Sequence, residues 1–357
     1  MSRRPLTVGI IANPASGRDV RRLTANAGLF SSTDKVSVIQ RLLAAFGATG
    51  ITQVLMPTDM TGIAAAVQKN SRSRQAREQH WPALEFLDLT LRQSVEDTRR
   101  AARWMAEREV SLIAVLGGDG THKAVAAEVG DIPLLTLSTG TNNAFPELRE
   151  ATSAGLAGGL YASGRVPAEI ALRRNKRLLV REPTRGLCEV ALVDVAVSPL
   201  AFVGARAISR ASDLAEVFVT FAEPQSIGIS ALCGLWLPVT RQEPHGAWMR
   251  LDPQSPEALL VPLAPAYCRA AGAGRRLPAT RRAPAPVPER RNSGPGWRAR
   301  DRVQPPRPAH GHPGCRRPAE HRRQRGPGTR GAPAPAGHRP RSPATPREPS
   351  VRRHPGE

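Results

Sequence analysis

Short apolar runs alternate with helical patterns through the first half of the chain. Each run has the length and β-branched content of a buried strand and ends in polar or glycine-rich turn residues. The runs are 6–12, 52–56, 84–88, 111–116 and 133–137. Strands separated by helices pair in parallel through right-handed crossovers, and such sheets are covered on both faces. We therefore predict an α/β domain over residues 1–164.

The segments between these runs have helical periodicity. Apolar residues fall on one face of 35–46, and a second helix is expected at 59–69. Ser94 and Asp97 have the spacing of a capping box, which predicts a helix that continues to Glu107.

The pattern changes after residue 165. Two strand-like segments, 178–181 and 189–197, are separated by a turn, and we predict a second, β-rich domain over 165–262. The apolar segments 213–221 and 226–235 fit either a strand or a helix.

Residues 263–357 have a different composition. From 266 onward there is no Ile, Phe, Met or Lys, and the segment holds 18 of the 34 prolines of the chain. One interpretation is a disordered basic tail. We favour another, an out-of-frame translation of a GC-rich gene that begins near 262–267. Codons allowed by 291–304, read one base later, can encode two alternating strands around an Asp-Gly hairpin turn.

Charge is distributed unevenly along the chain. The net charge is +21, but residues 266–357 have 22 Arg and 5 acidic residues, a net charge of +17, and the remainder carries only +4. The first 265 residues are therefore near neutral. Nucleic acid is expected as a partner only non-specifically, through the basic tail, if at all.

Leader segments and zinc motifs are not evident in the sequence. The four cysteines have no zinc-type spacing, and we expect them to be reduced. The chain begins without an apolar signal region, and no stretch approaches the roughly 20 apolar residues of a membrane span. We expect a cytoplasmic protein without a membrane span.

The glycine-rich loop, residues 117–121, lies between an apolar strand and a helical segment. Its glycines let backbone N–H groups approach phosphate oxygens, and the following helix start adds its positive dipole end. Asp119 can orient Mg²⁺ or accept a proton, and Thr121 can donate to a phosphate. The alternative for such a segment alone is a tight turn without a ligand. For His122, which follows the loop, the alternatives are a contact with phosphate and a surface position at the helix start, and we expect the surface position.

Two further loops follow strands of the same predicted sheet. The first loop is Asn13-Pro14-Ala15-Ser16-Gly17, and the third loop is residues 138–143. The carboxyl ends of parallel strands lie at one sheet edge, where ligands of such folds bind. We expect all three loops at this edge.

Together the three loops resemble the ATP-NAD kinase and diacylglycerol kinase superfamily, whose hallmark is Gly-Gly-Asp-Gly-Thr. The run from Ile10 to Glu147 is most similar to the acetoin catabolism protein X group of that superfamily. The resemblance covers about 260 residues. It implies an NAD kinase-like fold and ATP-dependent phosphorylation of a hydroxyl group, with NAD as the first-choice acceptor.

The resemblance also assigns expected roles to individual residues. Asp119 matches the catalytic aspartate that activates the 2′-hydroxyl of NAD. The residues expected to contact nucleotide are Gly117, Gly118, Gly120 and Thr121 at the ATP phosphates, Asn13 and Gly17 near the triphosphate, Thr141 and Asn142 in a second turn, and Asp194 in the β-rich domain. Mg²⁺ is inferred with ATP, and no protein metal site is expected.

Two departures leave the acceptor open. Val193 stands where NAD kinases have a polar residue, so weaker NAD binding and a gain from Val193→Asn are expected. The third loop continues into Ala144 and Phe145 instead of the NAD kinase pattern. The alternatives are a lipid or small-polyol kinase and a non-catalytic nucleotide-binding protein of acetoin metabolism. Homo-oligomerisation is also open.

Overall fold

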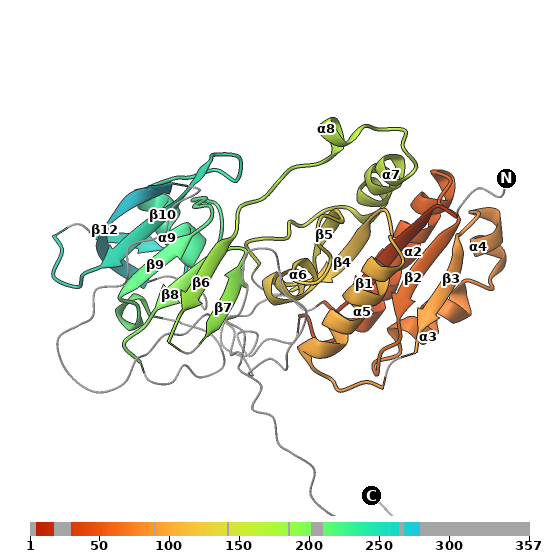
Figure 1. Cartoon of the computed structure of the whole chain (residues 1–357), viewed down its shortest axis with the longest axis horizontal. Helices are drawn as coiled ribbons and strands as arrows, with labels where there is room; N and C mark the ends of the chain where they lie inside the picture. Colours follow the sequence, from red (N-terminus) through yellow and green to blue (C-terminus); the bar gives the residue numbers. More distant parts are fainter. Residues whose placement is uncertain are drawn as a thin grey trace, which may run out of the picture. The chain divides into compact units, whose positions relative to one another are not determined.

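A computed structural model describes most of the first 278 residues (Figure 1). The described residues are 5–17, 30–88, 90–140, 143–184, 186–200, 210–256, 258–263 and 268–278. By internal contacts the chain divides into two units, Met1–His310 and Gly311–Glu357, and all described residues lie in the first.

The N-terminal part contains a five-stranded sheet with the order β3-β2-β1-β4-β5. All neighbouring strands are parallel. The strands are β1 (Thr7–Ala12), β2 (Gln53–Pro57), β3 (Ala83–Leu87), β4 (Ile113–Gly117) and β5 (Leu134–Ser138). The helices are α2 (Ser32–Ala48), α3 (Ile63–Asn70), α4 (Arg74–Glu78), α5 (Val95–Glu107), α6 (Asp119–Ala126), α7 (Ala151–Ala162) and α8 (Ala168–Ala171). The predicted α/β fold is confirmed.

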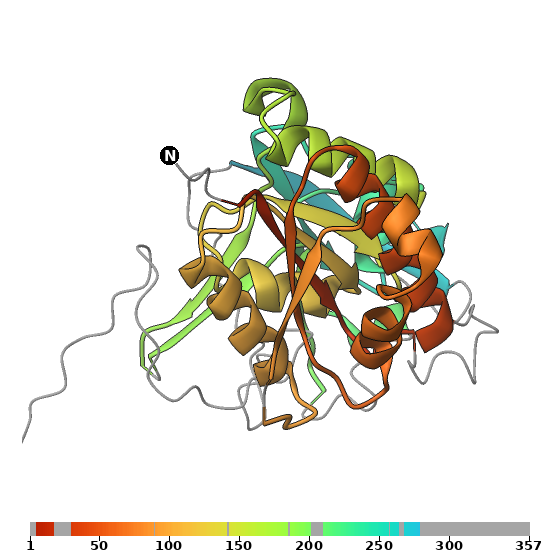
Figure 2. The same cartoon turned by 90° about the vertical axis from the view of Figure 1, so that its right-hand side faces the viewer.

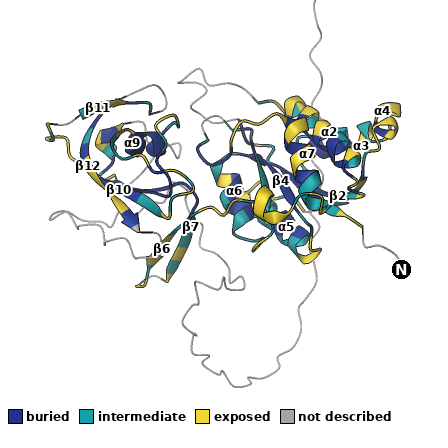
Figure 3. Ribbon diagram, turned by 90° about the horizontal axis from the view of Figure 1, so that it is seen from above, coloured by how far each residue is buried: buried dark blue, intermediate teal, exposed yellow. Residues whose placement is uncertain are grey.

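Helices cover both faces of this sheet because the buried strands are apolar on both sides (Figures 2 and 3). Along β1, Val8 and Ile10 pack with α2, α3 and α7, whereas Ile11 packs with α5 and α6. The chain order reverses between β1 and β4, so the loops after these strands meet at the switch point of the sheet.

Side-chain caps fix the start of two of these helices. Ser94 and Asp97 form the predicted capping box before α5. Ser31 and Asp34 form a second capping box before α2. Each box satisfies N–H groups that have no partner inside the helix.

The second part is built on an antiparallel sheet with the order β11-β12-β10-β9-β8, beside a separate β6–β7 hairpin. Its strands are β6 (Leu178–Glu182), β7 (Leu187–Ala191), β8 (Asp194–Val197), β9 (Glu216–Val219), β10 (His245–Leu251), β11 (Ala258–Val261) and β12 (Cys268–Pro278), with the 3-10 turn η2 (Ala211–Asp213) and helix α9 (Ile229–Trp236). The predicted β-rich character is confirmed. The predicted strand 189–197 is divided between β7 and β8, and the segment 226–235 forms most of α9.

Strand β12 lies beyond the domain end that the sequence predicts at residue 262. It pairs with β10 on one side and β11 on the other. Its buried positions include small residues, and a Cβ atom on Gly272 would lie 2.3 Å from the carbonyl oxygen of Arg250. The sequence did not predict this strand because it has few large apolar side chains. Backbone hydrogen bonds and the close approach of neighbouring backbones hold it in the sheet. Residues 279–357, the rest of the predicted tail, lie outside the described residues.

The cysteines differ from the expectation. Cys233 is a free, buried thiol, and burial is the main cause that raises its pKa. Cys188 is disulfide-bonded, so the expectation of a reduced thiol is wrong there. In the part of the chain that the structure describes, no helix has the length and apolar character to cross a membrane.

Candidate functional site

Hydrogen bonds join the three loops at the carboxyl edge of the parallel sheet. The side-chain amide of Asn13 donates to the hydroxyl of Thr121 over 2.8 Å. The hydroxyls of Ser16 and Thr139 lie 2.9 Å apart. These bonds tie the first loop to the glycine-rich loop and to the third loop, as the sheet topology requires.

The first loop is also held internally. Asn13 Oδ1 accepts from the N–H of Ala15 at 2.9 Å, and Ser16 Oγ donates to the carbonyl of Asn13 at 2.9 Å. Ser16 therefore uses its proton on Asn13, so Thr139 is the donor in the Ser16–Thr139 pair. Gly17 has φ +80°, and a Cβ there would lie 3.2 Å from the carbonyl oxygen of Thr139. A larger residue at 17 would be strained and crowded.

Lys35 lies under the first loop with only 1% of its surface exposed. Its Nζ donates to the carbonyls of Ser16 at 2.7 Å and Pro14 at 3.3 Å. Sequence reasoning missed this residue because a lysine in the first turn of an amphipathic helix is normally solvated.

The glycine-rich loop opens helix α6. The N–H groups of Thr121 and His122 donate to the carbonyl of Gly118 at 3.0 and 3.2 Å. Within the described residues, no acceptor takes the N–H groups of Asp119 and Gly120. These unpaired donors at a helix start favour an anion.

Two of the loop's site residues are already engaged inside the protein. Thr121 is buried, and its hydroxyl accepts from Asn13. A Cβ on Gly117 would lie 2.5 Å from Thr121 Cβ, so this glycine makes room for Thr121. The expected contact of Thr121 with phosphate remains a prediction.

Asp119 turns its carboxylate toward the loop after β5. Oδ1 accepts from the N–H of Phe145 at 2.8 Å, and both carboxylate oxygens lie 3.2 Å from the N–H of Ala144. The side chain is partly exposed. Asp119 therefore joins the glycine-rich loop to residues 144 and 145 and retains access to solvent.

Asn143 belongs to this site although the sequence did not single it out. Its amide nitrogen donates to Ser138 Oγ at 2.7 Å. Cβ atoms on Gly118 and Gly140 would lie 2.7 and 2.6 Å from the Asn143 amide group. The space that the Asn143 side chain occupies therefore requires glycine at both positions. The sequence alone does not show this relationship, because it depends on the folded structure. Thr141 and Asn142, predicted to contact nucleotide, lie outside the described residues.

His122 is fully buried, contrary to the expected surface position. Its Nδ1 lies 2.9 Å from the carbonyl oxygen of Gly118, so Nδ1 carries the proton and donates. Burial lowers the pKa of His122, opposed by the Gly118 carbonyl and by the charge of Asp119. The imidazole is therefore neutral near pH 7, and its hydrogen bond to the Gly118 carbonyl supports the glycine-rich loop on its buried side.

In the β-rich part, Asp194 and Val193 occupy different surroundings. Asp194 is buried at the start of β8, and its charge is a secondary cause that raises the pKa of Cys233. Val193 packs in an apolar cluster beside Phe145. The full cluster is Ala144, Phe145, Leu192, Val193 and Phe221. The apolar side chain of Val193 thus supports the loop that holds Asp119.

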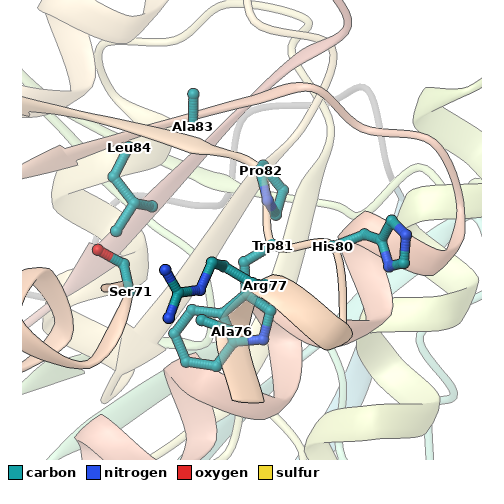
Figure 4. A pocket seen from close by; sticks show the side chains of 8 residues that line it. All are labelled: Ser71, Ala76, Arg77, His80, Trp81, Pro82, Ala83 and Leu84. Atoms are coloured by element: carbon teal, nitrogen blue, oxygen red, sulfur yellow. The ribbon is translucent and has the colours of Figure 1, made fainter. Parts of the chain in front are cut away.

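Other hollows lie away from these loops. The pocket in Figure 4 has a volume of about 330 Å³ and includes Trp81, Ala83 and Leu84. It lies where β3 begins, at the sheet edge opposite the three loops. Among the described residues, no group of three or more His, Cys, Asp or Glu could hold a metal ion.

Comparison with known proteins gives matches in both parts of the chain. The ATP-NAD kinase N-terminal domain matches residues 8–166, and the acetoin catabolism protein X C-terminal domain matches residues 176–282. The second match continues through β12. A protein of Cupriavidus necator named acetoin catabolism protein X is 47% identical over 247 residues, which cover 68% of this chain and 69% of the relative.

Proposed function

We propose that this chain, which belongs to the acetoin catabolism protein X group of NAD kinase-like proteins, transfers a phosphoryl group from ATP to a hydroxyl group. The observation that carries the proposal is the pair of N–H groups of Asp119 and Gly120 at the start of α6, for which the described part of the chain provides no acceptor. They lie where three loops meet at the ligand-binding edge of a parallel sheet, an arrangement suited to a triphosphate.

The 2′-hydroxyl of NAD is the first-choice acceptor, and the product would be NADP. The acceptor oxygen attacks the γ-phosphorus, the bond to the ADP oxygen breaks, and the hydroxyl proton passes to Asp119. Mg²⁺ bound with ATP would neutralise phosphate charge, and Asp119 is the carboxylate of the glycine-rich loop that fits such an ion. The remaining loop residues hold and orient the phosphates.

A lipid or small-polyol acceptor is the second candidate. The observation that favours it is the apolar cluster around Val193 and Phe145, directly behind the residues that hold Asp119. A valine cannot form a hydrogen bond to a ribose or an adenine, and apolar packing next to the site is more compatible with the acyl chain of a lipid acceptor. A non-catalytic nucleotide-binding role is the third candidate, because three N–H contacts already engage the Asp119 carboxylate. The name of the relative, acetoin catabolism protein X, supports the proposal that this chain acts in acetoin catabolism.

Phosphate transfer from labelled ATP tests these candidates directly. The purified chain is incubated with ATP and Mg²⁺ and with NAD or a diacylglycerol micelle, and labelled product is measured. We expect NADP, and we expect Asp119→Asn to lower turnover about 100-fold, since the variant loses charge and basicity. A thermal shift with ATP and Mg²⁺ but no transfer to either acceptor would favour the non-catalytic role. Unchanged turnover in Asp119→Asn would remove this residue from the mechanism.

A further inference from the structure

Arg241, in the segment between α9 and β10, reaches the loop after β5. Its Nη1 donates to the carbonyl oxygen of Phe145 at 2.8 Å, and its Nη2 donates to the carbonyl oxygen of Ala144. The N–H groups of the same two residues donate to Asp119. A short stretch of backbone therefore has a cation of the second domain on its carbonyl side and the Asp119 carboxylate on its N–H side.

The central element of this arrangement is one peptide unit. The carbonyl of Ala144 and the N–H of Phe145 belong to the same planar amide, and in a trans amide they point in opposite directions. Arg241 bonds the carbonyl and Asp119 bonds the N–H. Any rotation of this plane weakens both bonds together, and the two bonds polarise the amide in the same sense.

The guanidinium group is itself held in place. Its carbon lies 4.1 Å from the centre of the Phe221 ring, and Nε lies 3.3 Å from Glu223 Oε1. Only 15% of the Arg241 side chain is exposed. A guanidinium group that is held by an aromatic ring, a carboxylate and two carbonyls can in turn fix the backbone that it contacts.

We propose that Arg241 is a positioning residue that orients the Asp119 carboxylate through the Ala144–Phe145 peptide. The role in turnover rests on the proposed kinase function, because it assumes that Asp119 acts on the acceptor hydroxyl. The geometric link between Arg241 and Asp119 does not depend on that function. Arg241 has no role in ATP binding under this proposal, so its loss affects the transfer step.

The first test separates turnover from ATP binding. Arg241→Lys keeps the positive charge but replaces a planar fork with one ammonium, which cannot bond both carbonyls in the same geometry. We expect turnover with NAD to fall at least about tenfold while KM for ATP stays within about twofold. Arg276→Lys is the matched control, since that guanidinium bonds Glu243 and His245 instead. Unchanged turnover in Arg241→Lys would overturn the proposal.

The second test needs no enzymatic activity. Tm is measured for Asp119→Asn, Arg241→Lys and the double variant. Because both side chains hold one peptide plane, we expect the double variant to lose little more than the larger single loss. Additive losses would overturn the proposal whatever the turnover. If the wild-type chain transfers no phosphate to NAD, the proposed NAD kinase function fails. The Tm values of the two single variants and the double variant then decide alone whether Arg241 is coupled to Asp119.

Discussion

The Nζ atom of Lys35 lies 2.7 Å from the carbonyl oxygen of Ser16, and the lysine is 99% shielded from solvent by the first loop and the core beneath it. A buried cation therefore draws the loop carbonyls inward. The conformation that places the first loop at the carboxyl edge of the sheet therefore depends on this lysine.

Replacing this lysine should weaken ATP binding. Lys35→Met keeps the length of the side chain but removes both bonds to the loop, each of the charge-assisted kind that contributes about 1.5–3 kcal/mol. We expect about a tenfold weaker Kd for ATP with Mg²⁺, measured by calorimetry, and a lower Tm. Lys69→Met, on the exposed face of α3, is the control. An unaltered Kd in Lys35→Met would separate the first loop from ATP.

The structure changes the expectation for Val193. The sequence suggested that Val193→Asn would improve NAD binding, but this side chain is 5% exposed and packs in an apolar cluster. An amide buried there without partners costs about 1–3 kcal/mol. We expect a lower free energy of unfolding in urea and no gain in NAD affinity.

Val193→Ala serves as the control for that experiment, because it creates space without adding a polar group. This variant should have a lower free energy of unfolding because of lost packing alone. Stronger NAD binding by the asparagine variant, at unchanged stability, would show that position 193 faces the acceptor after all.

Two truncations locate the end of the folded part. A chain that ends at Pro278 keeps β12, whereas a chain that ends at 265 loses the strand between β10 and β11. In calorimetry, we expect the chain that ends at Pro278 to keep the Tm of the full chain. We expect the chain that ends at 265 to lose the unfolding transition of the β-rich domain. Both should lack salt-sensitive DNA binding, because most of the arginines after 266 are removed. Equal Tm values for the two truncations would show that β12 is dispensable.

His122 should make stability depend on pH. Its folded pKa is lowered below the ordinary 6.5, chiefly by burial, so the unfolded chain binds the proton more readily. Stability is therefore full above about pH 6.5 and falls as the pH drops below it, by at most about 1.4 kcal/mol per pH unit. His122→Asn can donate to the Gly118 carbonyl without titrating. Its Tm should fall less than that of the wild type between pH 7 and pH 5, and parallel curves would contradict this assignment.

The sequence was sufficient for most of the α/β fold because its signals are local. Apolar runs and the Ser94 capping box identify strands and a helix start without knowledge of distant contacts. Sheet topology then follows from the rule for parallel crossovers. The loops that follow β1, β4 and β5 could be placed together for the same reason.

The remaining features depend on contacts between distant residues. Three residues that shape the site could not be found from the sequence. Lys35 and Arg241 bond backbone carbonyls, and Asn143 occupies space left by glycines. Neither kind of contact leaves a pattern in the amino-acid composition. The position of β12 was missed because its pairing partners supply the information. The expected roles of Asp119 and Asp194 in catalysis and nucleotide binding remain predictions.

The place of β12 also determines when the second domain can form during synthesis. Among the described strands of its sheet, β12 is translated last, yet it lies between β10 and β11, which are made earlier. While the ribosome is still adding residues before Cys268, β11 lacks the strand with which it pairs, and the edge of β10 that later pairs with β12 is open. The α/β domain can fold as soon as it emerges. The second sheet must wait for a late strand, and during that interval its open edges are exposed to chaperones and to neighbouring chains.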